Sequence, residues 1–119
     1  MAANPVAPTG ELQLSTEKKA EETIVHGVGR ITSATSDLLQ STIRGLIPGT
    51  KRIVLDLAEV SYIDSSGIGA LVSVYMAASR AQCDLELANP QPRIRDLFEL
   101  SRLNVVFESH GGYRGLTPD

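Results

Sequence analysis

The residues best placed to do chemistry form one short run, Asp64-Ser65-Ser66-Gly67-Ile68-Gly69. The aspartate can accept hydrogen bonds from the first free N–H groups of a helix that begins at Ser65. The two serines then occupy the first helical turn, where their hydroxyls are exposed near the positive end of the helix dipole. A phosphate there would be stabilised by the dipole, and its charge of about −1.5 to −2 would repel a partner docked on the neutral serine. The run therefore predicts a place for a phosphorylation switch.

Gly67 and Gly69 follow the two serines. Because they lack a Cβ atom, they would let another backbone approach Ser65 and let the helix start pack closely on a sheet. Each glycine costs roughly 1 kcal/mol of helix propensity. The local composition by itself also fits a plain helix N-cap and turn without further function.

An enzymatic interpretation of this run is weak. A serine hydrolase would use Ser65 or Ser66 with His26 or His110 as the base, but the Gly-x-Ser-x-Gly elbow is absent because Asp64 stands two residues before Ser66. We interpret His26, inside a predicted strand, as structural. A dinucleotide loop would need a third glycine, and the Gly-Lys-Ser/Thr of an ATP loop is missing. We predict a protein that is not an enzyme and needs no cofactor, with weak nucleotide binding at the helix start as an open alternative.

The composition indicates one small folded domain. The chain has 119 residues, of which 42% are hydrophobic and 21% charged, as in soluble globular proteins. The net charge of −3, without a Lys/Arg run longer than a pair, disfavours nucleic acid and anionic membranes as partners. No apolar run approaches the roughly 20 residues of a membrane span, and the first residues do not resemble a secretion signal, so we expect a cytoplasmic protein. The single cysteine, Cys83, rules out an internal disulfide and a zinc site, and we expect a monomer.

Hydrophobic periodicity predicts the elements that position the run. Strands are expected at 12–15, 23–28, 52–57, 84–88 and 105–107, and helices from about 33 to 47, from 65 onward and from 90 onward. The strand at 52–57 is nearly continuously apolar, which is typical of a central strand, and it should end near residues 58–59. Helices between strands require crossover connections, whereas a turn at 18–22 would make the first two strands antiparallel.

We therefore predict a single α/β domain over residues 11–110. It has a mixed, mostly parallel central sheet of about four to five strands with helices packed on it. Residues 1–10 should be a flexible lead-in and residues 111–119 a flexible tail.

Details of the helices bear on the site. Thr32 and Ser33 are the expected N-caps of the first helix, and Asn89 and Pro90 the expected cap and first-turn proline of the third. The second helix has an apolar stripe that should face the sheet. The stripe consists of Ile68, Leu71, Val72, Tyr75 and Met76.

Residues 53–71 resemble the STAS family, the domain of anti-sigma factor antagonists. The family signature is an apolar strand, an acidic-aromatic loop, and then Asp-Ser-Ser/Thr-Gly-Leu/Ile-Gly before a helix. The resemblance extends to residues 89–103, which look like the family's third helix and its exit, and it covers most of the chain. The Asp-Ser-Ser-Gly box is by far its most specific part.

The resemblance implies a function. In this family the serine after the aspartate is phosphorylated by an anti-sigma factor that is itself a serine kinase, and a serine phosphatase reverses the reaction. The unphosphorylated form binds the anti-sigma factor around the helix start and so releases the sigma factor, without contact with DNA. The implied acceptor is Ser65, with Ser66 as second choice. The implied partner contacts are Arg30, Thr32, Tyr62, Ser66 and Ile68.

Gly29-Arg30-Ile31-Thr32 departs from the family, which usually has Gly-Glu-Leu-Asp there. The two changes alter the charge offered to a kinase-type partner by about three units. Arg30 could pair with a phosphate on Ser65 if the strand end and the helix start are neighbours, or it could be an ordinary solvated arginine. The departure leaves an alternative function, that of a STAS adaptor in another signalling assembly or transporter-associated complex, without phosphorylation.

Overall fold

The computed structural model describes residues 11–103 and 113–114. In chain order the elements are β1 (Leu12–Lys19), β2 (Glu22–Ile31), α1 (Ser36–Leu46), the 3-10 turn η1 (Ile47–Gly49), β3 (Arg52–Ile63), α2 (Ser65–Arg80), β4 (Asp84–Ala88), α3 (Pro92–Leu100) and β5 (Tyr113–Arg114). The strands form one sheet in the order β1-β2-β3-β4-β5. β1 and β2 are antiparallel and the other neighbours are parallel. The predicted α/β class and mixed sheet are confirmed.

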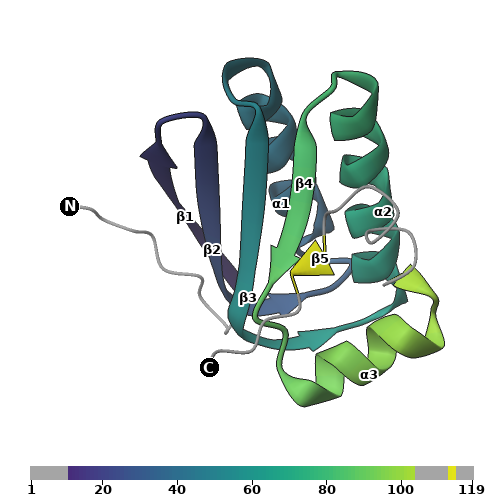
Figure 1. Cartoon of the computed structure of the whole chain (residues 1–119). Coiled ribbons are helices and arrows are strands. Elements are labelled where there is room, and N and C mark those ends of the chain that lie inside the picture. Colours follow the sequence, from purple (N-terminus) through teal and green to yellow (C-terminus); the bar gives the residue numbers. More distant parts are fainter. Residues whose placement is uncertain (1–10, 104–112, 115–119) are drawn as a thin grey trace.

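The helices are arranged unequally around the sheet. Figure 1 shows α1 and α2 side by side on one face, and α3 below the ends of β3 and β4. The main core lies between the sheet and the α1–α2 layer, because apolar side chains alternate toward that side along the strands. Its fully buried members include Leu39, Ile43, Ile53, Leu55, Leu71 and Leu87. Among the described residues, no helix covers the opposite face of β1 and β2.

Three strands are longer than the sequence indicated. β2, expected at 23–28, extends over Glu22–Ile31. β1 continues to Lys19 through its pairing with β2. The sequence did not indicate this extension, because the second half of the strand consists of exposed polar residues without an apolar pattern. β3 does not end near residues 58–59 but continues to Ile63, since its pairing with β2 resumes after two register shifts. The predicted strand at 105–107 lies outside the described residues. The short β5 lies beyond residue 110, within the segment expected to form the tail.

The expected caps of α1 were wrong. α1 begins at Ser36, with Thr35 in the N-cap position. The Thr32 hydroxyl instead accepts the Ala34 N–H at 3.1 Å, and the Thr32 N–H donates to Thr35 Oγ1 at 2.9 Å. The Thr35 hydroxyl donates to the Arg30 carbonyl at 2.9 Å. The hydroxyls therefore close a turn between β2 and α1, which delays the helix.

The expected cap of α3 was also wrong. α3 begins at Pro92, and Gln91 occupies the N-cap position. Asn89 instead adopts a left-handed backbone conformation with φ of 58°. Asparagine tolerates that conformation better than most residues, so it makes the sharp exit from β4. Proline still supplies the first helical position, but two residues later than expected.

The buried face of α2 is rotated from the predicted stripe. Leu71 and Tyr75 are buried as expected, whereas Met76 is 48% exposed. Ile68 and Val72 are only partly buried. The remaining buried residues of α2 are Gly67, Ala70, Val74 and Ala78. Small residues thus form much of the packed face, which allows the helix to approach the sheet.

No helix in the described part of the chain has the length and apolar character needed to cross a membrane.

Candidate functional site

Asp64 connects the end of β3 to the start of α2. Its backbone is extended, and its Oδ1 accepts the Gly67 N–H at 3.0 Å, as an N-cap should. Its own N–H donates to the Ile31 carbonyl at 3.2 Å, and its carbonyl accepts the Ile68 N–H at 3.0 Å. Ser65 follows as the first residue of α2 and is exposed. The cap therefore holds this serine at the helix start, in contact with solvent.

Gly67 lies where the first turn of α2 rests on the sheet. A Cβ atom at this position would come within 2.5 Å of the Ile31 carbonyl oxygen and 2.7 Å of Ile63 Cγ2. Glycine is required by this close approach, as the sequence suggested. Gly69 differs, because a Cβ atom there would meet nothing within 4 Å. The packing role expected for Gly69 is therefore wrong, although its exposed surface is open to another molecule.

Arg30 and Tyr62 are neighbours across β2 and β3. The Arg30 guanidinium carbon lies 5.6 Å from the centre of the Tyr62 ring, a cation–π distance. Ile31 and Ile63, the next residues, are buried toward α2, so strand alternation places the arginine and tyrosine on the other side. The strand end and the helix start are neighbours, but this ring contact would compete with any pairing of Arg30 and a phosphate on Ser65.

The remaining residues suggested as partner contacts lie at the same edge of the sheet. Thr32 lines a shallow hollow of about 230 Å³ with Glu11, Arg30 and Ala34. Ser66 is exposed in the first turn of α2, and Ile68 is partly buried just after it. The carboxyl ends of two parallel strands and the start of a helix thus carry all of the suggested residues, where α/β proteins place their sites.

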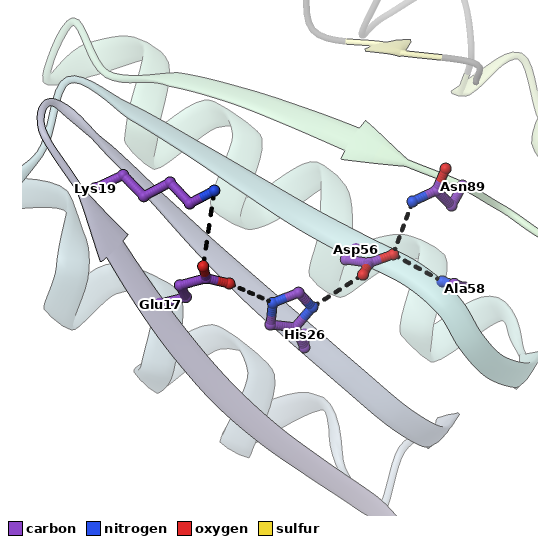
Figure 2. Close-up of polar contacts among 6 residues, drawn as sticks. All are labelled: Glu17, Lys19, His26, Asp56, Ala58 and Asn89. Atoms are coloured by element: carbon purple, nitrogen blue, oxygen red, sulfur yellow. Dashed lines mark hydrogen bonds and ion pairs between the residues drawn. The ribbon is translucent and has the colours of Figure 1, made fainter. Parts of the chain in front are cut away.

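The open face of the sheet carries a polar cluster that the sequence did not indicate (Figure 2). His26 Nδ1 lies 2.9 Å from Asp56 Oδ2, and Nε2 lies 3.1 Å from Glu17 Oε1. Asp56 Oδ1 accepts bonds from the Ala58 N–H and from the Asn89 side-chain amide, both at 3.1 Å. We call these residues the His26–Asp56 cluster. Adjacent strands bring its members together, so only the register of the sheet could have revealed it.

The hydrogen bonds in this cluster shift the pKa values of His26 and Asp56. Hydrogen bonds to Glu17 and Asp56 raise the pKa of His26 above its usual value, against a smaller effect of burial. Burial acts to raise the pKa of Asp56, but the bonds from Asn89, Ala58 and His26 together leave it below its usual value. The cluster therefore favours a protonated His26 beside an ionised Asp56.

A second charged group lies at the other end of the parallel strands. Arg52 Nε is 3.3 Å from Glu86 Oε2, and other guanidinium nitrogens lie 3.7 Å from Asp84 and 4.0 Å from Glu22. The Glu86 side chain is only 9% exposed, so its carboxylate depends on nearby cations and donors. This group ties together the starts of β2, β3 and β4. Within the described residues, no group of three or more His, Cys, Asp or Glu could hold a metal ion.

Comparison with known families gives a clear match. A model of the STAS domain family matches residues 13–112. BtrV of Bordetella bronchiseptica, which is named as an anti-sigma factor antagonist, is 30% identical over 80 residues. These residues cover 66% of this chain and 69% of BtrV.

Solved structures show the same fold. The chain is similar to the anti-sigma factor antagonist SpoIIAA in its unphosphorylated form, with a TM-score of 0.70, 19% identity, and coverage of 87% of this chain and 88% of that one. It is also similar to an anti-sigma factor antagonist from Mycobacterium paratuberculosis, with a TM-score of 0.76 and 19% identity over 93% of this chain and 92% of the other. At such identities the likeness is one of fold.

Proposed function

Because this chain belongs to the STAS domain family, we propose that it is an anti-sigma factor antagonist whose partner binding is switched by phosphorylation of Ser65. The observation that carries the proposal is the exposed Ser65 at the start of α2, held by the Asp64 cap. The name of BtrV supports the class of partner. In this function the chain is a binding protein rather than an enzyme, and it acts in the cytoplasm, where the partner controls transcription.

The first turn of α2 suits a phosphoserine. The N–H groups of Ser65 and Ser66 are among the first of the helix, which have no acceptor within it. A phosphate near them is favoured by the helix dipole by about 0.3–1 kcal/mol. The anti-sigma factor, acting as a serine kinase, would transfer the γ-phosphoryl group of ATP to Ser65 Oγ, releasing ADP and the hydroxyl proton. A serine phosphatase would restore the hydroxyl by hydrolysis.

The added charge would act without moving the helix. Asp64 and Gly67 fix the first turn against the Ile31 carbonyl and the Ile63 side chain. A change of about −1.5 to −2 charges on this fixed surface would repel a partner that docks against the neutral serine. The switch therefore works by charge and desolvation at the interface.

The partner surface would extend from Ser65 over the neighbouring strand ends. We place Arg30, Thr32, Tyr62, Ser66 and Ile68 in it. Arg30 brings a positive charge to this edge, already oriented by the Tyr62 ring. A partner that fits this surface should therefore present a carboxylate opposite Arg30.

The first test is to purify the protein from its native cells with its bound partners. Mass spectrometry with site-resolved fragmentation of the tryptic peptide of residues 53–80 should find phosphate on Ser65, and a kinase-type anti-sigma factor should copurify. An unmodified peptide in both growing and stressed cells, together with a transport or scaffold partner, would contradict the proposal and favour a STAS adaptor.

Variants of the two serines provide the second test. Ser65→Ala should stay bound to the partner, and Ser65→Asp should bind at least about tenfold more weakly, equal to about 1.4 kcal/mol. Ser66→Ala is the matched control and should still be switched by the kinase. Circular dichroism should show that all three variants fold, since both serines are exposed. Loss of switching in Ser66→Ala alone would move the acceptor to Ser66.

A further inference from the structure

The second half of β3 bends away from its regular pairing with β2. Between the pairs His26–Asp56 and Ile31–Ile63, β3 advances seven residues while β2 advances five. The first irregularity directly follows Asp56, where Leu57 and Ala58 lie opposite Gly27 alone. Extra residues of this kind bend a strand and increase its twist. Figure 1 shows β3 turning from the middle of the sheet toward the start of α2.

The Asp56 carboxylate holds this bend from three sides (Figure 2). Its Oδ1 accepts the N–H of Ala58, a residue of the bulge itself, at 3.1 Å. The same oxygen accepts the Asn89 amide at the end of β4, and Oδ2 faces His26 of β2. The Ala58 carbonyl is held as well, because the Gln91 side-chain amide donates to it at 2.9 Å. Side chains therefore satisfy both backbone groups of the bulge residue.

The geometry around His26 sets its protonation state. The ionised carboxylates of Glu17 and Asp56 can only accept hydrogen bonds, so both ring nitrogens can bond to them only when both carry protons. The charged groups that face the His26 ring are Glu17 on β1 and Asp56 on β3. Lys19, also on β1, is paired with Glu17, and its Nζ lies 3.7 Å from Glu17 Oε2. Asn89 adds a neutral donor from the end of β4.

We propose that the Asp56 carboxylate and the protonated His26 ring form a pH-sensitive clamp that sets the bend of β3, and so positions Tyr62 and the first turn of α2. The interaction surface that this clamp positions is the one in the proposed function, so its consequence for partner binding rests on that function. His26, Asp56 and Asn89 are positioning residues, because they act through the backbone of β3.

The clamp is expected to loosen as pH rises. The raised pKa of His26 means that its contribution is complete below the ordinary histidine value and is lost as pH rises through the folded value. Loss of either ring proton places a nitrogen lone pair against a carboxylate oxygen, so one of the two bonds is lost. Loss of this bond should loosen the bend of β3 and so weaken the hydrogen bond of the Asp64 N–H at the end of the strand.

Amide hydrogen exchange of the free, full-length chain tests the clamp. The reporter is the Asp64 N–H, which bonds to Ile31, and the reference for global unfolding is the Ile43 N–H in α1. Between about pH 6 and pH 8.5, we expect the protection factor of Asp64 to fall several-fold and up to about tenfold, while that of Ile43 changes less. In His26→Gln the protection of Asp64 should be independent of pH. The control Glu59→Gln, an exposed acid on the same strand, should behave like the wild type.

A second variant keeps the test valid if His26→Gln folds poorly. Asn89→Gly removes the amide donor but tolerates the left-handed backbone of this residue. It should lower the protection of Asp64 relative to Ile43 at every pH while the His26 ring, followed by NMR, still titrates. The clamp is refuted if Asp64 and Ile43 lose protection by equal factors, if His26→Gln retains the wild-type pH dependence, or if Asn89→Gly leaves Asp64 unchanged. No partner takes part, so failure of the proposed function would leave these results intact.

Discussion

The contact between Gly67 and the sheet can be tested by adding one methyl group. In Gly67→Ala the new Cβ would lie 2.5 Å from the Ile31 carbonyl oxygen, 2.7 Å from Ile63 Cγ2 and 2.9 Å from Ile31 Cγ2. Two of these atoms are side-chain methyls that can shift, but the carbonyl oxygen belongs to the backbone. That carbonyl also accepts the Asp64 N–H, so moving it disturbs the cap.

The magnitude follows from two opposing terms. Overpacking of this kind costs about 1–3 kcal/mol, and occasionally more when backbone must move. Replacing glycine with alanine inside a helix gains up to about 1 kcal/mol. We therefore expect Gly67→Ala to lower the free energy of unfolding by about 1–2 kcal/mol. Gly69→Ala gains the same helix propensity with nothing within 4 Å of its Cβ, so it should raise the free energy of unfolding by about 0.5–1 kcal/mol.

Urea denaturation followed by circular dichroism measures both variants against the wild type. Equal slopes of the free energy against urea concentration would show that the two glycine variants differ in stability alone. The difference between the variants should be about 2 kcal/mol, with opposite signs relative to the wild type. A Gly67→Ala protein as stable as Gly69→Ala would refute the close contact between α2 and the ends of β2 and β3.

Three further changes test the cap and the two charged groups. Asp64→Ala should lower the free energy of unfolding by about 0.5–2 kcal/mol because the Gly67 N–H loses its acceptor, and Asp64→Ser should recover most of this in urea denaturation. Arg52→Met should cost about 1–3 kcal/mol, since the nearly buried Glu86 carboxylate loses its guanidinium, and Arg52→Lys should cost less. The lowered pKa of Asp56 gives stability that is present above its ordinary value of 3.8 and lost as pH falls through the folded value. Below about pH 5, the melting temperature should therefore fall more steeply with decreasing pH for the wild type than for Asp56→Asn.

The sequence predicted the start of α2 and the layer architecture because these depend on local signals. An aspartate before two serines defines the N-cap, and the apolar run from Ile53 identifies a central strand. The buried face of α2 was harder to predict than its start, because apolar and small residues occur almost all around this helix. The buried face includes Gly67, which rests closely on the sheet, and a search for large apolar side chains does not detect a glycine.

The end of β3 and the His26–Asp56 cluster could not be predicted from local patterns. The nearly continuous apolar run stops after Leu57, which indicated that the strand ends near residues 58–59, but pairing with β2 keeps residues 58–63 in the strand despite the irregular register. Asn89 looks like a helix cap in sequence, whereas in the structure its amide binds a carboxylate on a neighbouring strand. Each of these features depends on which residues lie opposite one another across strands, and a single sequence contains no direct record of that register.

The anchoring of the first turn of α2 also bears on the lifetime of the protein in the cell. The Asp64 N–H, the Ile31 carbonyl and the glycine contact hold this turn independently of what the Ser65 hydroxyl carries. The helix dipole favours a phosphate here by only about 0.3–1 kcal/mol, so the phosphorylated chain should open to proteases at most a few-fold less often, because degradation follows the population of opened molecules. Under the proposed function, the ratio of the two forms would be set mainly by the rates of modification and its reversal, and less by unequal turnover.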